Sequence, residues 1–177
     1  MVNLVNTITI IRILLSPAIF IFLLFGNYYL CIFLFFIAGI SDYLDGYLAR
    51  KYNAVSNLGE ILDPIADKIL IIFSLFGLAV TLNSFVIAFL SSFIIAREIG
   101  IAALRDYSSR NNISDKTKVT YLAKIKTAIQ LFAISLYLLA LALNLNLLII
   151  ISDIVLIIAT LVTLYSGYQY VNNVLKK

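Results

Sequence analysis

The chain has 177 residues, a length that suits one domain. Hydrophobic residues make up 63% of it and its mean hydropathy is +1.05, whereas globular domains are about 45–50% apolar. A chain this short has too little interior to bury so much apolar surface, so the composition excludes an ordinary water-soluble domain. The net charge of +4 is modest, and we expect no nucleic-acid partner.

Six apolar segments predict an all-α polytopic membrane protein that forms a single domain over residues 1–177. Each segment is close to the ~20 residues that a transmembrane helix needs. A short N-terminal segment before the first of them is expected to lie at the membrane interface. The predicted spans are Ile8–Phe25, Tyr28–Ala49, Ile61–Val80, Phe85–Leu104, Tyr121–Leu143 and Leu147–Tyr168.

The basic residues between these segments predict how the chain crosses the membrane. The short turns after the first, third and fifth segments contain no lysine or arginine. Two longer connectors, Lys51–Gly59 and Asp106–Thr120, and the tail Lys176-Lys177 are basic. Because positive charge is retained on the cytoplasmic side, the connectors and both termini are expected there. The protein is therefore predicted to be a multi-pass protein of the cell membrane.

Four aspartates interrupt this apolar pattern. A charge at the centre of a bilayer costs at least ~2.5–3.5 kcal/mol, so these side chains should not face lipid. Asp42 and Asp45 share one face of a helix, and Asp63 and Asp67 share one face of the next. Opposed antiparallel helices would bring the four carboxylates into one pocket. Such hard oxygen ligands suit magnesium, manganese or calcium.

Charged residues on five segments are predicted to lie at a similar depth. At a rise of ~1.5 Å per residue, Arg12, Asp42, Asp67 and Arg97 all lie roughly 20 Å below the outer turns. Lys124 and Lys126 should lie slightly nearer the cytoplasm. Snorkelling toward the interface could explain any one of them, Lys124 above all. Their common depth favours a polar cavity that opens to the cytoplasm.

The acidic segment also resembles a known family. It matches the signature D-x2-D-G-x2-A-R-x8-G-x3-D-x3-D of the CDP-alcohol phosphotransferase family. The matching residues are Asp42, Asp45, Gly46, Ala49, Arg50, Gly59, Asp63 and Asp67. The resemblance implies two divalent cations, Mg²⁺ or Mn²⁺, that Asp42, Asp45, Asp63 and Asp67 bind. It also implies that Asp67 is catalytic and accepts a proton from the acceptor hydroxyl.

The resemblance implies a lipid donor, CDP-diacylglycerol, whose tails remain among membrane lipids. Gly46 and Arg50, together with Ser56 in the connector, would bind the cytidine diphosphate. Ala49 and Gly59, like Gly46, have no bulky side chain, so the donor could approach the helix backbone beside the metals. Near the N-terminus, Asn6 and Thr9 match residues that lie close to the nucleotide in the family.

Basic residues in later segments predict the acceptor. Arginine and lysine are the usual ligands of phosphate groups, and Arg97, Arg105, Lys124 and Lys126 are the candidates here. The runs Ala96–Ile99 and Lys124–Thr127 resemble the subfamily that transfers a phosphatidyl group to glycerol 3-phosphate. The alternative for Arg97 is that it only neutralises a neighbouring acid.

Other interpretations stay open at this stage. The same chemistry could use inositol phosphate, serine or phosphatidylglycerol as acceptor. More distantly, the acidic cluster could be the ion site of a cation transporter. Families of this kind often dimerise, so a homodimer is possible. Asp153 has no evident partner in the sequence, and Tyr165, Tyr168 and Tyr170 are expected to form an interfacial aromatic belt.

Overall fold

The computed structural model describes residues 2–51, 57–111 and 121–175, and these residues form six α-helices. The prediction of an all-α fold is confirmed. The helices are α1 (Val2–Leu24), α2 (Tyr28–Lys51), α3 (Asn57–Thr81), α4 (Phe85–Arg110), α5 (Tyr121–Leu143) and α6 (Asn146–Leu175). Because α1 begins at Val2, the N-terminal segment that we expected at the interface continues into this helix without a break.

Five helices of the described chain contain a stretch long and apolar enough to cross a membrane. The sixth, α2, has 24 residues, and its described apolar stretch is Tyr28–Asp42. The five stretches are Asn6–Leu24, Ile61–Thr81, Phe85–Arg110, Ile125–Leu143 and Asn146–Val174. The chain is thus a multi-pass helical membrane protein.

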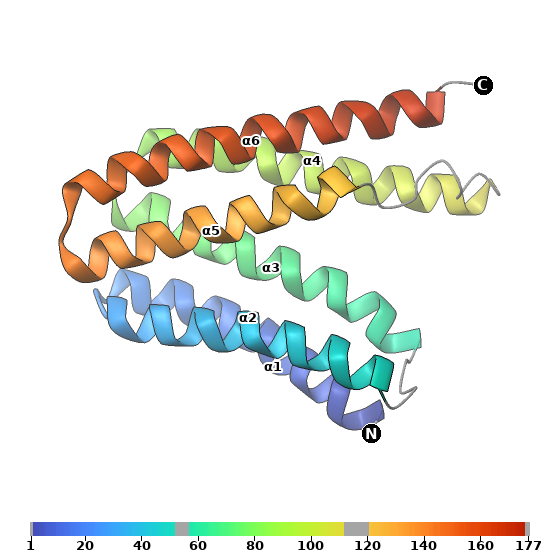
Figure 1. Cartoon of the computed structure of the whole chain (residues 1–177), viewed down its shortest axis with the longest axis horizontal. Helices are drawn as coiled ribbons and strands as arrows, with labels where there is room; N and C mark the ends of the chain where they lie inside the picture. The colour runs from blue at the N-terminus through green and yellow to red at the C-terminus, as the bar shows by residue number, and fades with distance from the viewer. Residues whose placement is uncertain (1, 52–56, 112–120, 176–177) are drawn as a thin grey trace.

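The helices run alternately up and down, and Figure 1 shows that their short turns lie at one end of the bundle. Both termini lie at the opposite end, together with the C-terminus of α2 and the N-terminus of α3. This arrangement agrees with the grouping of basic segments that the sequence predicts.

Each of the three short turns is formed in the same way. Gly26, Asn83 and Asn144 follow α1, α3 and α5 with φ angles of 74°, 46° and 53°. In each turn, the N–H of the next residue donates to the carbonyl five residues earlier, as from Asn27 to Phe22 at 3.0 Å. These bonds and left-handed residues define the Schellman end of a helix. Glycine and asparagine tolerate that conformation best, which is why the sequence marked these turns.

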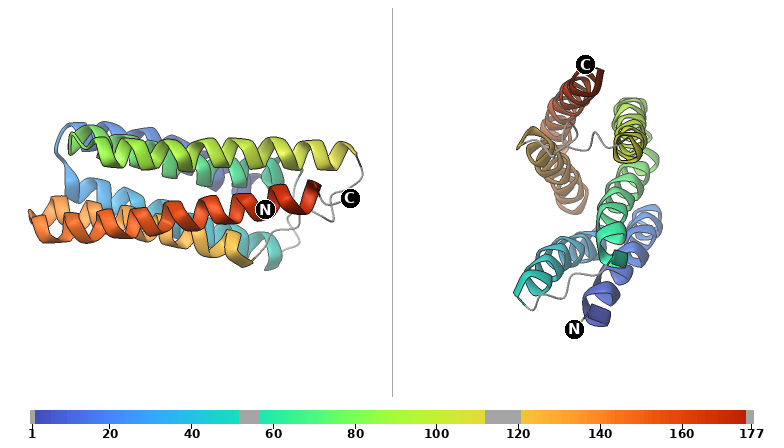
Figure 2. Two further views of the ribbon diagram at one scale, coloured as in Figure 1. Left: turned by 90° about the horizontal axis from the view of Figure 1, so that it is seen from above. Right: turned by 90° about the vertical axis from the view of Figure 1, so that its right-hand side faces the viewer.

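The bundle consists of two groups of helices that α3 joins. α1 packs against α2 and α3, whereas α6 packs against α4 and α5. α3 also contacts α4 and α5, and the end-on view in Figure 2 shows it between the two groups. Gly77 permits the close approach of α3 to α1, because a Cβ there would lie 2.7 Å from Leu23 Cδ1. One apolar core extends through both groups and includes Leu75, Ile94 and Ile134.

Candidate functional site

A cavity of about 400 Å³ lies where α3, α4 and α5 meet. Two of the four signature aspartates, Asp63 and Asp67, line it from α3. Three of its basic residues come from α4 and α5, namely Arg97, Arg105 and Lys126. Its lining also includes Lys68, Glu98, Thr127 and Gln130, with apolar residues such as Ile71 and Ile94. Two residues of the predicted acidic site and three of the predicted phosphate site therefore share one cavity.

On the acidic side, a single arginine connects α1, α2 and α3. Arg12 Nη1 donates to Asp42 Oδ1 at 2.7 Å and to Asp67 Oδ1 at 2.8 Å. The Arg12 side chain is completely buried, whereas those of Asp42 and Asp67 are 52% and 43% exposed. Asp42 of α2 and Asp67 of α3 therefore lie close to each other, and α1 supplies the cation between them.

A second residue of α1 contacts the remaining acid of α3. Thr9 is buried, and its hydroxyl donates to Asp63 Oδ1 at 3.0 Å. Thr9 and Arg12 are three residues apart, so they lie on the same face of α1. This face meets both acidic helices.

Several predicted site residues can be located only along the backbone. Asp45, Gly46, Ala49 and Arg50 belong to α2, but their side chains lie outside the described part of the structure. Ser56 lies outside the described residues altogether. Gly59 is buried in α3, and Asn6 is partly buried in α1.

The donor set suits Mg²⁺ or Mn²⁺ by its chemistry. Asp42, Asp63 and Asp67 offer carboxylate oxygens, which both ions prefer. Asp42 Oδ1 and Asp67 Oδ1 accept from the same nitrogen of Arg12, at 2.7 and 2.8 Å, so the two oxygens lie close together. Among the described side chains, no three acids form a metal-binding group. The fourth signature acid, Asp45, is not among the described side chains. The residues fit a divalent cation in type, and two of them, Asp42 and Asp67, converge.

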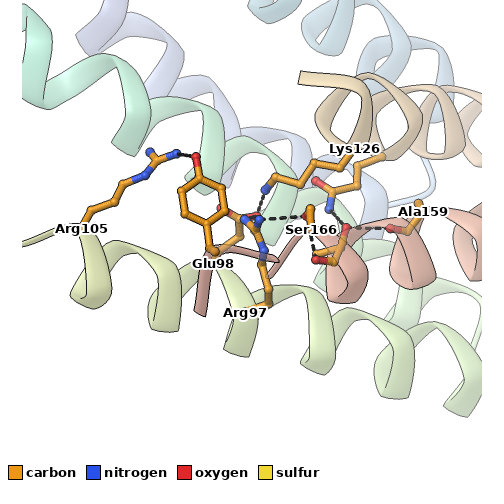
Figure 3. Close-up of polar contacts among 9 residues, drawn as sticks. Arg97, Glu98, Arg105, Lys126, Ala159 and Ser166 are labelled. Carbon is orange, nitrogen blue, oxygen red and sulfur yellow. Dashed lines mark hydrogen bonds and ion pairs between the residues drawn. The ribbon is translucent and has the colours of Figure 1, made fainter. Parts of the chain in front are cut away.

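On the basic side, Arg97 is held by contacts within the protein. Its Nη2 donates to Ser166 Oγ of α6 at 2.9 Å and its Nη1 to Glu98 Oε1 at 3.2 Å. Gly167 leaves room for it, since a Cβ there would lie 3.0 Å from Arg97 Cγ. Lys126 Nζ donates to the same Glu98 oxygen, and Figure 3 shows that oxygen between the two cations. Arg97 therefore does neutralise a neighbouring acid, Glu98, as the alternative interpretation stated.

Arg105 and Arg97 both contact Tyr170 of α6. Arg105 Nη2 donates to the Tyr170 hydroxyl at 2.9 Å, and the two guanidinium carbons lie 5.3 Å (Arg105) and 5.8 Å (Arg97) from the centre of its ring. Tyr170 is only 1% exposed, so the expectation that it belongs to an interfacial belt is wrong. It is buried because the arginines provide partners for both its hydroxyl and its ring. The side chain of Lys124 lies outside the described part of α5.

Asp153 does have a partner, which the sequence did not indicate. The Tyr137 hydroxyl of α5 donates to Asp153 Oδ1 of α6 at 2.5 Å. Tyr137 lies about two helical turns beyond Gln130, the last cavity residue of α5, and neither Tyr137 nor Asp153 lines the cavity. The pair explains how a carboxylate is tolerated within an apolar helix.

Sequence reasoning located the acidic and basic residues but missed how they are held. Arg12 contacts Asp42 and Asp67, two of the residues that were predicted to lie at its depth. The residues that we missed are those whose role is to contact a charged group: Arg12 as a bridge, Thr9 toward Asp63, and Ser166 and Tyr170 on α6. A usable signal existed for α1 alone, where a threonine and an arginine share one face of an apolar helix.

The fold and the site define the class of protein. It is a polytopic helical membrane protein with a cavity that is lined by both carboxylates and basic side chains. A family model described as CDP-alcohol phosphatidyltransferase matches residues 2–165, and the chain belongs to this family. A relative from Rickettsia felis is 38% identical, over 95% of this chain and 93% of its own. Relatives from Blochmanniella floridana and Haemophilus influenzae are 38% and 33% identical over 97% and 92% of this chain and 90% and 88% of their own. All three are named CDP-diacylglycerol–glycerol-3-phosphate 3-phosphatidyltransferase.

Proposed function

We propose that this protein transfers the phosphatidyl group of CDP-diacylglycerol to glycerol 3-phosphate, giving phosphatidylglycerophosphate and CMP. The observation that carries the proposal is the shared cavity, in which Asp63 and Asp67 lie opposite Arg97, Arg105 and Lys126. A phosphate-bearing acceptor needs cations beside the reacting centre, whereas a site that only binds metal does not. The names of relatives that match almost the whole chain support the same reaction.

Two divalent cations, Mg²⁺ or Mn²⁺, are the cofactors of the proposed reaction. Asp42, Asp45, Asp63 and Asp67 would bind them. When bound, such cations hold the pyrophosphate of the donor and neutralise the charge that develops at the attacked phosphorus.

Asp67 is the proposed proton acceptor. The oxygen of an acceptor hydroxyl forms a bond to the phosphorus of the phosphatidyl group, and the bond from that phosphorus to the bridging oxygen of the pyrophosphate breaks. CMP leaves with the bridging oxygen, while the hydroxyl proton passes to the Asp67 carboxylate. Because Asp67 is also held by Arg12, most of the rate must come from positioning and charge neutralisation.

The donor is assigned to α2 and the start of α3, beside the cavity. Gly46, Arg50 and Ser56 would contact the cytidine diphosphate, with Asn6 nearby. Ala49 and Gly59 would allow close approach to the helices. An apolar hollow of about 330 Å³ between α2, α3 and α5 supports lateral entry of a lipid tail. Gly39 and Leu70 line it, each three residues from a signature aspartate, Asp42 or Asp67.

The phosphate of the acceptor is assigned to Arg97, Arg105, Lys124 and Lys126. Lys68 lines the same cavity one residue after Asp67, so we add it to this group. It would lie between the reacting centre and the acceptor phosphate. The two arginines suit this role because a guanidinium can donate two parallel hydrogen bonds to a phosphate.

The proposal includes the placement of the protein in the cell membrane as a single domain. The six helices would all cross, with both termini and the mouth of the cavity on the cytoplasmic side. The common end of the termini in Figure 1 and the basic tail support this orientation. A homodimer is also proposed, and the mass of the detergent-solubilised protein would test it.

The test is CMP release from CDP-diacylglycerol by purified protein in detergent with Mg²⁺ or Mn²⁺. Glycerol 3-phosphate is offered beside inositol phosphate, serine and phosphatidylglycerol in parallel reactions. We expect activity with glycerol 3-phosphate alone, and its loss in Asp67→Asn.

Each other outcome identifies which part of the proposal is wrong. Activity with a different acceptor would keep the acidic site and refute the assignment of Arg97, Arg105 and Lys126. No CMP from any acceptor, in folded protein, combined with metal flux into liposomes without nucleotide, would instead support a cation transporter.

A further inference from the structure

The face of α1 that meets the acidic helices carries two buried polar residues, Thr9 and Arg12. Both are 0% exposed, and neither belongs to the lining of the cavity. Among the described side chains, they donate to Asp42, Asp63 and Asp67 at 2.7–3.0 Å. Arg12 Nε also points to Ser41 Oγ at 3.4 Å, one residue before Asp42.

Burial excludes direct contact of Thr9 and Arg12 with substrate in this arrangement. The carboxylates are different, because Asp42 and Asp67 keep 52% and 43% of their side-chain surface accessible. Each acid therefore has one side against α1 and another that a ligand can reach. The resemblance to the family places Thr9 near the nucleotide, but its observed contact is with Asp63.

The charge balance gives Arg12 a physical role. Asp42 and Asp67 come from different helices and would repel each other if they were brought together without a cation. A fully buried arginine offsets that repulsion, and its planar group fixes the direction of its hydrogen bonds. Outer contacts of this kind fix the orientation of ligating side chains in metal sites, and their loss typically weakens metal binding about 10–100-fold.

We propose that Thr9 and Arg12 are positioning residues. Thr9 orients Asp63, and Arg12 orients Asp42 and Asp67, so that these carboxylates can bind a divalent cation. The proposal rests on the metal site of the proposed function. α1 is thereby an outer layer of that site: it fixes the carboxylates from the buried side while their accessible sides face the ligand.

The test measures Mn²⁺ binding to purified protein without substrate, by electron paramagnetic resonance of free Mn²⁺. Thr9→Val keeps the shape of the side chain and removes the hydroxyl, so we expect Mn²⁺ to bind about 10–100-fold more weakly. Thr9→Ser should restore most of the affinity. Thr160→Val is the matched control, because Thr160 is buried and its hydroxyl donates to Leu156 within α6. It should bind Mn²⁺ as the wild type does.

Arg12 is tested in the same assay, with thermal unfolding as a second readout. Arg12→Gln should weaken Mn²⁺ binding about 10–100-fold and should also lower the unfolding temperature of the metal-free protein. Arg12→Lys, which keeps the charge, should fall between it and the wild type. If Arg12→Gln does not fold, Thr9→Val and Thr9→Ser still decide the question.

Three results would overturn the inference. Unchanged Mn²⁺ affinity in Thr9→Val and Arg12→Gln would reduce both residues to a structural role. Tighter binding in Arg12→Gln would mean that Arg12 competes with the cation. If the wild type binds no Mn²⁺, the metal site of the proposed function fails and this inference fails with it. The first two results leave the proposed function intact.

Discussion

The acidic and the basic part of the site are built in opposite ways. On the acidic side, the counter-charge Arg12 is fully buried and the carboxylates of Asp42 and Asp67 are about half exposed. On the basic side, the cations themselves are nearly buried, since Arg97 and Lys126 are 6% and 7% exposed and both donate to Glu98.

This difference has a consequence for ligand binding. The acidic side presents accessible carboxylates, so a small cation can bind there with little rearrangement. The arginines and Lys126 already have partners on α4 and α6, so an acceptor phosphate must exchange with some of these contacts. We therefore expect the acidic side to control the chemical step and the basic side to control acceptor affinity.

The largest effect is expected from loss of one acid of the cavity. Asp63→Asn should lower CMP release at least about a hundredfold, because losing this proposed metal ligand would remove several kcal/mol of charge stabilisation. The matched control is Asp153→Asn, which changes another acid in a membrane helix but one paired with Tyr137. It should retain most of the activity. Similar losses in both variants, measured in folded protein, would contradict the assignment of Asp63.

A smaller and different effect is expected on the basic side. Arg97→Gln should raise the KM for glycerol 3-phosphate about 10–100-fold, since a hydrogen bond to a charged group contributes about 1.5–3 kcal/mol. The KM for CDP-diacylglycerol should change little. Arg97→Lys keeps the charge without the paired donors and should show an intermediate KM. An equal rise for both substrates would argue against separate sides for donor and acceptor.

The contact between Arg105 and Tyr170 permits a finer test. Tyr170→Phe removes the hydroxyl that accepts from Arg105 and keeps the ring that lies beside both arginines. A hydrogen bond of this kind contributes about 1 kcal/mol, so the KM for glycerol 3-phosphate should rise about fivefold. Tyr170→Leu also removes the ring and should have a larger effect. A normal KM in both variants would show that Tyr170 does not position the arginines.

The smallest effect on activity is expected from Tyr137, whose hydroxyl donates to Asp153 away from the cavity. Tyr137→Phe leaves the carboxylate without this donor, which should reduce stability by about 1–3 kcal/mol. Thermal unfolding in detergent would detect this change, while kinetic constants should match those of the wild type. An altered KM for either substrate would contradict the separation of this pair from the site.

Much of the fold could be predicted because its signals are local. Apolar runs of membrane length predicted the helices, and the residues Gly26, Asn83 and Asn144 marked the three short turns. The common depth of Arg12, Asp42 and Asp67 also followed from counting residues, because a helix has a fixed rise.

The partners of the charged residues could not be predicted in the same way. Tyr170 was assigned to the membrane interface because a tyrosine near the end of a span usually lies there. It is buried because α6 packs against α4 and brings its ring to Arg97 and Arg105. Asp153 had no visible partner, since Tyr137 is 16 residues away on another helix.

The sequence by itself determined the helical membrane class, the positions of the short turns, and which residues carry charge at the depth of the site. These properties depend on hydropathy, helical periodicity and local backbone conformation, all of which act over a few neighbouring residues. Only the tertiary structure decided that Arg12 connects Asp42 to Asp67 and that α6 holds the arginines of α4. The rotation of each packed helix sets which side chains meet, and that rotation depends on contacts between segments far apart in the chain.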